Sequence, residues 1–349
     1  MAKKPVEVQS ITAQEMRTLA IQAKVNVPIE QTWVWAEFEE TFPDRDLVGF
    51  FSVTVEGQPI AIFGMTHYHY HGFEFLWIKH GPVWLRPEDE ELERGAVYAI
   101  VRWIKKHRPR TAFVRMHLRY PYPGARPPMQ ITTYDRTVIV SLADNEDDLM
   151  TGFKRRARTK VRGVLRKTPL AIEEETEAAI ADMSPYYAIM AETADRQGFT
   201  PWSREVYENL LRTLKRPHAR LYAARVDGEV VGFAIFTLSG SEAVYYYAAA
   251  NDLGRQNEAS IQILYRGLVD LGKEGFETMD LMGVGSDLAP SLNVLTAFKS
   301  GFSQEICEVS PAYDIPVNKT LFKALEMLRG GKSKVDTLKS KLSRSEKDD

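Results

Sequence analysis

The chain has 349 residues, of which 44% are hydrophobic and 26% are charged, and its formal net charge is −2 at pH 7. This length exceeds what one hydrophobic core usually supports, so we expect two domains, and the near-neutral balance argues against a general nucleic-acid-binding protein. The single cysteine excludes an internal disulfide framework and fits a reducing compartment. Because neither a membrane-spanning apolar run nor a signal-peptide pattern is present, we expect a cytoplasmic protein.

The first half of the sequence predicts a β-hairpin, a long helix and a further strand. Residues 48–55 and 59–64 are strand-like and flank a Glu-Gly turn, where glycine supplies the positive φ that a tight hairpin needs. Residues 88–107 carry apolar side chains at three- and four-residue spacing, which predicts an amphipathic helix. Residues 112–117 then return as a strand.

The second half repeats this order of elements. Strands at 220–226 and 230–236 flank an Asp-Gly turn, and a strand at 243–248 precedes a helix at about 257–272 and a strand at 276–281. The repetition predicts an internal duplication of one α/β unit.

We place the domain boundary between the two halves, near residue 145. The first domain is then 1–145, and the second is 146–315. Residues 331–349 are mostly charged and polar, which predicts a polar tail outside the packed domains.

A run of basic residues follows the predicted boundary. Residues 154–167 carry eight basic side chains and no acidic one, so the rest of the chain is acidic. Four arginines are spaced three or four residues apart and therefore share one face of a helix: Arg155, Arg158, Arg162 and Arg166. Such a face suits the phosphates of RNA or of a nucleotide-linked precursor, and it equally suits a solvated cationic surface beside acidic neighbours.

A lysine near the C-terminus is the sharpest candidate for chemistry. The strand at 276–281 leads into Asp280-Leu281-Met282-Gly283, and after a loop Lys299 follows Phe298. A cation at the mouth of an apolar cleft can stabilise the oxyanion of an acyl transfer, or it can bind a phosphate of the donor. The alternative is a surface lysine whose stem covers a phenylalanine.

Aromatic and cationic side chains elsewhere add to this candidate site. On a strand, Tyr245 and Tyr247 face one way and Tyr246 the other, so that at least one ring lines a cleft unless all three fill the core. Arg196 stands before a glycine, where its guanidinium can grip a carboxylate or phosphate, or can compensate the C-terminus of a helix.

Three histidines alternate in the segment His67-Tyr68-His69-Tyr70-His71. Alternate residues of a strand project on one face, as metal ligands would. No fourth ligand with a characteristic spacing follows them, and a solvated strand face is the simpler interpretation, so we expect no metal site.

These features, taken in order, resemble the FemABX family of peptidoglycan-branching aminoacyltransferases. The matching segments are residues 31–35, 81–83, the basic helix at 153–167, 196–199, the tyrosine strand, 280–283 and 298–302. The resemblance implies an α/β (α+β) fold of two tandem GNAT-like acyltransferase domains that face a cleft, without a coiled-coil insert. It also implies a C-terminal helix at about 316–330 that packs back onto the first domain.

The family resemblance further implies an enzyme, an aminoacyltransferase without a cofactor. It would transfer an amino acid from aminoacyl-tRNA to the side-chain amine of the third stem-peptide residue, in UDP-MurNAc-pentapeptide or lipid II. A monomer with peripheral contact to the inner membrane face is expected. By this resemblance Lys299 and Phe298 belong to the acyl-transfer site. Substrate binding falls to Arg196, Tyr246, Tyr247, Trp35 and Asp280.

Two other functions stay open on the sequence alone. One is a GNAT-like N-acyltransferase that uses acyl-CoA or an acyl carrier protein on a small amine, and the other is a non-catalytic RNA- or envelope-associated binding module. GNAT enzymes hold the CoA pyrophosphate on backbone amides of a glycine-rich turn that opens a helix. The corresponding segment, 253–260, lacks the later glycine and places Glu258 where an anion would lie, which argues against CoA.

Overall fold

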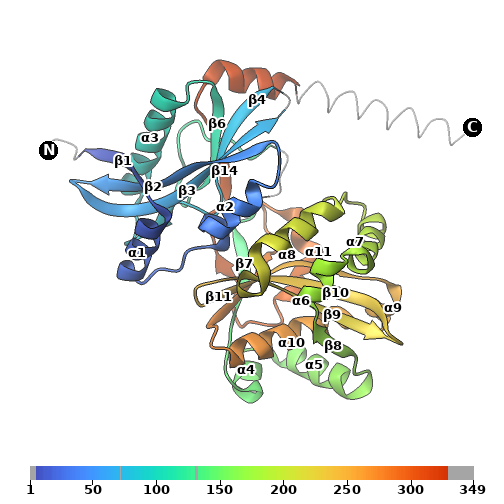
Figure 1. The fold of residues 1–349 in the computed structure, drawn as a ribbon. Helices are drawn as coiled ribbons and strands as arrows, with labels where there is room; N and C mark the ends of the chain where they lie inside the picture. Colours follow the sequence, from blue (N-terminus) through green and yellow to red (C-terminus); the bar gives the residue numbers. More distant parts are fainter. Residues whose placement is uncertain (1–4, 71, 130–132, 329–349) are drawn as a thin grey trace, which may run out of the picture. The chain divides into compact units, whose positions relative to one another are not determined.

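The computed structural model describes residues 5–70, 72–129 and 133–328, and the chain divides into two compact units (Figure 1). The first unit comprises Met1–Leu19, Pro43–Gln130 and Ala312–Asp349, and the second comprises Ala20–Phe42 and Ile131–Pro311. Each unit is built on one mixed β-sheet with helices, which confirms the predicted α/β (α+β) class.

The sheet of the first unit has the strand order β1-β2-β3-β4-β6-β14, with the short β5 paired to β3. Its strands are β1 Val6–Ile11, β2 Arg45–Val55, β3 Gln58–Tyr70, β4 Phe73–Ile78, β5 Val83–Trp84, β6 Thr111–His117 and β14 Ala312–Pro316. The β4–β6 pair is parallel, and the other pairs in this sheet are antiparallel.

Local sequence signals produce the predicted hairpin and helix of the first unit. Glu56 and Gly57 both adopt positive φ, and the hairpin closes with Val55 opposite Gln58. The helix α3 (Glu90–His107) begins after Asp89, whose carboxylate accepts a hydrogen bond from the Leu92 amide. Its buried side chains pack on the sheet, and α1 (Ala13–Ala23) crosses from the first unit into the second.

A buried ion pair connects β14 to the rest of the first unit. Arg115 on β6 donates to both carboxylate oxygens of Asp314, at 2.6 and 3.0 Å, and the Met129 amide donates to the same carboxylate. The two side chains are 3% and 0% exposed, and the guanidinium lies 5.0 Å from the Trp77 ring. After Val317, the segment at 319–328 is helical, and its Phe322 packs in a cluster with Ala112, Phe113 and Met129. This pair therefore brings the end of the described chain back to the first unit.

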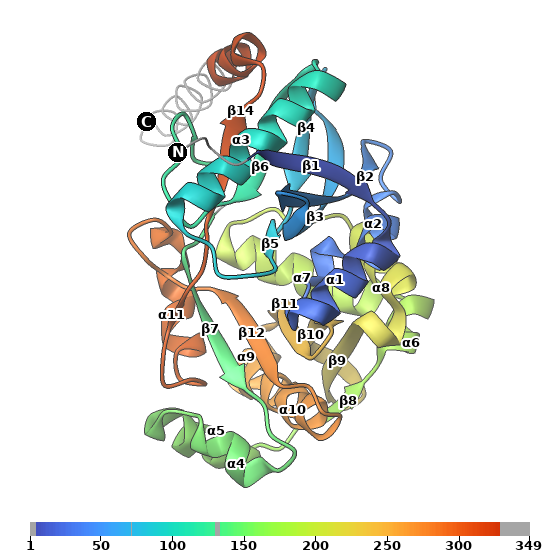
Figure 2. The same cartoon turned by 90° about the vertical axis from the view of Figure 1, so that its left-hand side faces the viewer.

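The second sheet has the order β13-β7-β12-β11-β10-β9-β8, and Figure 2 shows β7, β12 and β11 as neighbours. Its strands are β7 Arg136–Ser141, β8 Ala171–Glu174, β9 Ala219–Val226, β10 Glu229–Ser239, β11 Glu242–Ala250, β12 Thr278–Gly283 and β13 Cys307–Glu308. The helices of this unit are α2 Trp33–Glu39, α4 Glu146–Thr151, α5 Arg155–Lys167, α6 Thr176–Ala181, α7 Ser184–Gln197, α8 Arg204–His218, α9 Asp252–Gln256, α10 Ala259–Lys273 and α11 Asn293–Lys299, with short 3₁₀ turns at Ile29–Gln31 and Pro290–Leu292.

Alternation along β10 builds a separate core on each face of the second sheet. Ala234 and Phe236 belong to a cluster with α5 and α10, whereas Phe233 and Ile235 belong to a cluster with α2, α7 and α8. Side chains of successive strand residues point to opposite faces, which explains the division. Both faces of the sheet are therefore covered by helices.

Two irregularities in the second sheet shape its centre. The parallel strands β11 and β12 pair only from Glu242 opposite Thr278 to Val244 opposite Asp280, and beyond that point they no longer pair with each other. A β-bulge also places Tyr247 opposite Ile235 but Tyr245 opposite Phe236, so that Tyr246 is the extra residue.

The bulge corrects the predicted arrangement of the three tyrosines. Tyr245 belongs to the α10-side cluster, while Tyr246 and Tyr247 both pack against the opposite cluster. Strict alternation was wrong here because the bulge inserts one residue into the strand.

The observed units differ in extent from the predicted domains. The chain divides at residue 130 rather than near 145, because β7 pairs with β12 of the second sheet. Residues 20–42 also belong to the second unit, where Trp35 is buried. The predicted tail, 331–349, lies outside the described residues. Among the described residues, no helix combines the length and apolar character needed to cross a membrane.

We expect Asp314→Asn to lower the free energy of unfolding by about 3 kcal/mol, because it leaves the Arg115 guanidinium buried without its counter-charge. Chemical denaturation followed by circular dichroism measures the change. The control Glu90→Gln removes an exposed ion pair with Arg94 and should cost less than about 1 kcal/mol. Equal effects of the two substitutions would contradict the role assigned to the buried pair.

Candidate functional site

A cavity of about 510 Å³ lies in the second unit, lined by residues from the segments where β11 and β12 are no longer paired. One wall is the second half of β11, from Tyr245 to Ala250, and another is the end of β12 at Met282 and Gly283. The end of α7, Arg255 on α9, the start of α10 and the helix α11 also line it, together with Tyr134 and Phe199. We call this space the Lys299 cavity, after the cation described next.

Lys299 ends α11 and is 7% exposed, although it lines the cavity. Its Nζ donates to the carbonyl oxygens of Gly283 at 2.9 Å and Met282 at 3.3 Å. Burial lowers the pKa of Lys299 to about 8, and the negative charge of Asp280 opposes part of this shift. The side chain is therefore still mostly protonated at pH 7, and its two carbonyl bonds use two of the three donors of an ammonium.

Asp280 holds the backbone that carries these carbonyls. Its carboxylate accepts hydrogen bonds from the Thr137 hydroxyl and, at 2.7 Å, from the Met282 amide, and Met282 takes a left-handed φ of 63°. A side chain at Gly283 would stand 2.6 Å from the Tyr134 ring, so only glycine fits there. Asp280 is not among the residues that line the cavity, but its carboxylate holds the backbone whose carbonyls bind Lys299. Its role in substrate binding stays a prediction.

The cavity has a positive character. Its lining includes three cations, and no Asp or Glu is among the described residues that line it. Arg196, at the end of α7, donates to the Ala250 carbonyl at 3.0 Å, and its guanidinium lies 3.7 Å from Asp252. Arg255 on α9 donates to the same Asp252 carboxylate at 2.5 Å. Together with Lys299, these groups suit an anionic ligand such as a phosphate.

Arg196 fits both interpretations made from the sequence. Gly198, in the left-handed conformation, ends α7 one residue after Gln197, so the guanidinium lies near the helix C-terminus. It also lines the Lys299 cavity, as a ligand-binding arginine would.

The aromatic residues predicted for the site divide between cavity and core. Tyr246 and Phe298 line the cavity, and the Tyr246 hydroxyl donates to Glu30 at 2.9 Å. Burial raises the pKa of Tyr246 well above its ordinary value, so this hydroxyl stays protonated. Trp35 packs 5.6 Å from the Tyr246 ring and donates to Glu39, so it supports Tyr246 from the buried side. Tyr247 packs on Tyr207, 5.0 Å away between ring centroids.

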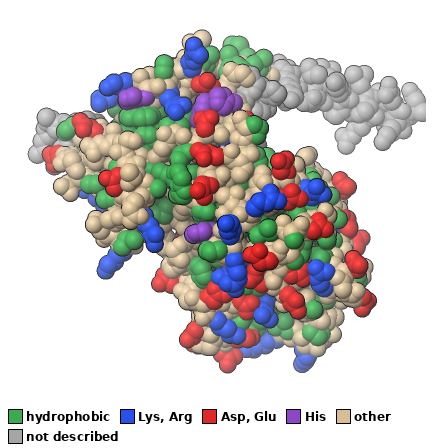
Figure 3. Space-filling model, viewed as in Figure 1, with side chains coloured by type: hydrophobic (Ala, Val, Ile, Leu, Met, Phe, Trp, Pro, Cys, Tyr) green, Lys and Arg blue, Asp and Glu red, His purple; other side chains and the backbone are tan. Residues whose placement is uncertain are grey.

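The predicted basic helix is α5, and its arginines are not among the residues that line the cavity. The helix packs through Val161 on the α10-side core, and Arg158 donates to the Thr151 carbonyl at 3.3 Å. Lys160 pairs with Glu258 at 3.1 Å. Over the second unit, the face seen in Figure 3 carries basic and acidic side chains interspersed. The role of Arg155, Arg158, Arg162 and Arg166 in phosphate binding stays a prediction.

Sequence reasoning missed several residues of the cavity. Tyr134 precedes β7, is half-buried and lies beside Gly283, and desolvation raises its pKa. Arg255 lies in the segment considered for CoA, yet its charge was not singled out. Nothing in the local pattern of either residue distinguishes it from an ordinary surface or core position, because both reach the site through the tertiary fold.

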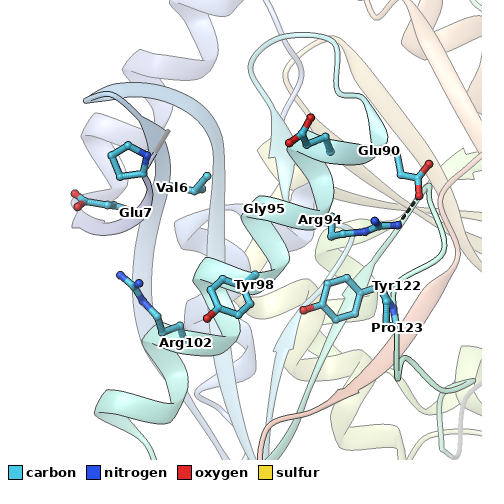
Figure 4. A pocket seen from close by; sticks show the side chains of 11 residues that line it. Val6, Glu7, Glu90, Arg94, Gly95, Tyr98, Arg102, Tyr122 and Pro123 are labelled. Carbon is cyan, nitrogen blue, oxygen red and sulfur yellow. Dashed lines mark hydrogen bonds and ion pairs between the residues drawn. The ribbon is translucent and has the colours of Figure 1, made fainter. Parts of the chain in front are cut away.

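A second cavity, of about 900 Å³, lies in the first unit between β1 and α3 (Figure 4). Its lining mixes the carboxylates of Glu7 and Glu90 with the guanidinium groups of Arg94 and Arg102, beside Tyr98. Arg94 is already paired with Glu90 at 2.5 Å. The charged side chains of this lining are exposed, whereas Lys299 is buried, so we take the Lys299 cavity as the candidate site.

Comparisons with known proteins bear on the fold that carries this cavity. The family model described as an acetyltransferase (GNAT) domain matches residues 152–290, most of the second unit. A search of the curated proteins found no match.

Solved structures show the same fold. FemX superposes with a TM-score of 0.71 at 17% identity, over 92% of this chain and 100% of its own. A second structure is the C-terminal domain of an Agrobacterium fabrum protein provisionally named a lysylphosphatidylglycerol synthetase. It superposes with a TM-score of 0.53 at 15% identity, over 90% of this chain and 96% of its own. A tandem GNAT protein from the clavulanic acid biosynthesis pathway superposes with a TM-score of 0.51 at 12% identity, over 90% of this chain and 99% of its own. The predicted tandem GNAT-like fold is thereby confirmed.

The depressed pKa of Lys299 makes the stability of the fold depend on pH. Between about pH 8, the folded-state pKa, and about 10.4, the ordinary lysine pKa, the unfolded chain binds the proton and the folded chain does not. The free energy of unfolding of the wild type, measured relative to that of Lys299→Met, should therefore increase with pH across this window. Denaturation midpoints of both proteins at pH 7, 8, 9 and 10 measure it, and a pH-independent difference would show that the lysine is not buried as described.

Proposed function

We propose that this protein is an acyltransferase that moves an amino acid from aminoacyl-tRNA to the side-chain amine of the third stem-peptide residue of a peptidoglycan precursor. The acceptor is UDP-MurNAc-pentapeptide or lipid II, and no cofactor takes part. One observation carries the proposal: a buried, protonated Lys299, held by two backbone carbonyls, lines a cavity with three cations at the parting of two strands of a GNAT fold.

The chemistry of ester aminolysis fits such a cavity. The neutral acceptor amine attacks the ester carbonyl and forms a tetrahedral intermediate with a negative oxygen and a positively charged nitrogen. The intermediate collapses as the ester C–O bond breaks, and a proton from this nitrogen passes to the leaving tRNA oxygen, which departs as a hydroxyl. A cation fixed in a partly dry site stabilises that oxygen more than the neutral ester, and so lowers the barrier. Since the ester is already activated, positioning of the two substrates supplies much of the remaining acceleration.

The charges of the cavity support an anionic donor. Arg196 and Arg255 are the groups that we assign to phosphates at the end of the donor or in the precursor, since guanidinium groups bind phosphate in a two-pronged manner. The fold of FemX, which covers 92% of this chain, and the basic face of α5 favour a tRNA donor over a small acyl carrier.

A second candidate, an N-acyltransferase that uses acyl-CoA on a small amine, is favoured by the acetyltransferase (GNAT) domain match. The start of α10, where a GNAT enzyme would hold the pyrophosphate, argues against it. Glu258 precedes the helix and pairs with Lys160 at 3.1 Å, so a carboxylate stands beside the helix N-terminus.

The deciding experiment incubates the purified chain with charged bacterial tRNA and UDP-MurNAc-pentapeptide that has a dibasic third residue. Mass spectrometry of the acceptor should show one added aminoacyl unit, lost after RNase treatment. Transfer from acetyl-CoA instead, insensitive to RNase, would establish the second candidate. Absence of transfer to the UDP-linked acceptor and to lipid II, from either donor, would overturn the proposal.

Lys299→Met should lower the single-turnover rate of aminoacyl transfer about 10²-fold or more, because the oxyanion loses its cation while the cavity keeps a side chain of similar length. Quench-flow with radiolabelled aminoacyl-tRNA measures the rate. Lys273→Met, at an exposed lysine that ends α10, is the matched control and should leave the rate unchanged. A folded Lys299→Met variant with a normal rate would remove Lys299 from the mechanism.

The pH dependence of the same rate distinguishes the two protonation states of Lys299. If the ammonium is the active form, the ratio of the wild-type rate to the Lys299→Met rate should fall as pH rises through about 8. Taking the ratio removes the titration of the acceptor amine, which affects both enzymes. A ratio that rises through the same pH would identify the neutral amine as a general base instead.

A further inference from the structure

Imidazole and carboxylate groups gather on one face of the first sheet, at the start of β2 and β4 and the end of β3. Asp46 on β2 stands directly opposite His67 on β3, and Glu74 on β4 stands directly opposite His69. Cross-strand neighbours project to the same side of a sheet, as do residues two apart on one strand. The four side chains therefore share one face, although they come from three strands.

Their atoms are close enough to share one ion. His67 Nδ1 lies 3.0 Å from Asp46 Oδ2, and His69 Nε2 lies 4.0 Å from Asp46 Oδ1. One ligand atom from each of the three residues falls within 4.8 Å of the others. Ligands at about 2.0–2.1 Å from a tetrahedral Zn²⁺ stand roughly 3.4 Å apart. Because the side chains of Asp46 and His69 are half exposed, they can rotate to close the difference.

His67 is the unusual member of this cluster. The sequence predicted a solvated strand face, but His67 is 4% exposed, and its Nε2 is buried without a hydrogen-bond partner among the described residues. That nitrogen points toward Glu74, whose Oε2 is 3.6 Å away. A buried ring nitrogen without a partner is unfavourable, so a state that engages both nitrogens is expected.

We propose that Asp46, His67 and His69 bind a divalent transition-metal ion of the Zn²⁺ type, with Glu74 as the positioning residue. Coordination through Nδ1 requires a neutral His67 with its proton on Nε2, and that proton is then donated to Glu74. Such carboxylate–histidine–metal arrangements fix the tautomer and the ring orientation. Two imidazoles with one carboxylate favour Zn²⁺ and its neighbours over Mg²⁺ or Ca²⁺, which prefer oxygen ligands alone.

The site differs from the Lys299 cavity in every residue and lies in the other unit, so it does not depend on the proposed acyl transfer. Sequence reasoning rejected a metal because no further ligand follows the histidines at a characteristic spacing. The additional groups come from β2 and β4, through cross-strand pairing that a linear motif does not contain. Three protein ligands leave a position for water, and the ion would join β2 to β3.

Isothermal titration of the metal-stripped full chain, freed of any histidine tag, with ZnCl₂ tests the proposal. One Zn²⁺ per chain should bind, and His69→Ala and Asp46→Asn should each weaken the affinity at least 100-fold. Glu74→Gln should weaken it by about 10- to 100-fold, as expected for a group that orients a ligand. His107→Ala, at an exposed histidine of α3, is the matched control and should bind like the wild type.

Two further readouts separate this site from surface binding. Co²⁺ in place of Zn²⁺ should give the intense visible absorption of a four-coordinate ion in the wild type and in His107→Ala, but not in His69→Ala. Zn²⁺ should also raise the Tm of the wild type and of His107→Ala and leave that of His69→Ala unchanged, since an ion that binds only the folded chain stabilises it. Absence of saturable binding, or equal binding by His69→Ala and the wild type, would overturn the proposal.

Discussion

The short pairing of β11 with β12 is the constraint on which the candidate site depends. The two parallel strands pair over three residues of each and then part, so the backbone beyond Val244 and Asp280 needs other partners. On β12, the carbonyls of Met282 and Gly283 accept hydrogen bonds from Lys299, and on β11, the Ala250 carbonyl accepts from Thr193 and Arg196. The gap in the sheet thus creates the cavity and also fixes two of its cations.

A buried ammonium is unfavourable for the fold, and the surroundings of Lys299 show how far it is compensated. Two carbonyl dipoles and the negative charge of Asp280 stabilise the protonated form, yet burial still lowers the pKa to about 8. Asp280 is itself held by Thr137 and by the Met282 amide, so the lysine, its acceptors and its counter-charge form one connected group. A side chain retained at this cost to stability is typical of a functional site.

Patterns that act over a few residues were predictable from the sequence, and pairings across the chain were not. The Glu56-Gly57 turn and the apolar periodicity of α3 define a hairpin and a helix locally, and both occur as predicted. Strand periodicity does not say which sheet a strand joins, so the assignment of β7 and of residues 20–42 to the second unit could not be read from it. The same limit explains the site. Lys299 and Arg196 have local signals, whereas Tyr134 reaches the cavity only through the fold.

The two kinds of positive charge in the second unit differ in physical character. The arginines of α5 form a continuous basic run on a helix whose Arg155, Arg162 and Arg166 are exposed, so salt screens their attraction for an anionic partner. Lys299 is buried and tied to backbone carbonyls, so its field acts at one point of the cavity and is screened little. In the acyl transfer that we propose, long-range attraction of the donor falls to the arginines of α5. Stabilisation of the oxyanion falls to Lys299, because a fixed cation in a partly dry site meets a developing charge without reorganising.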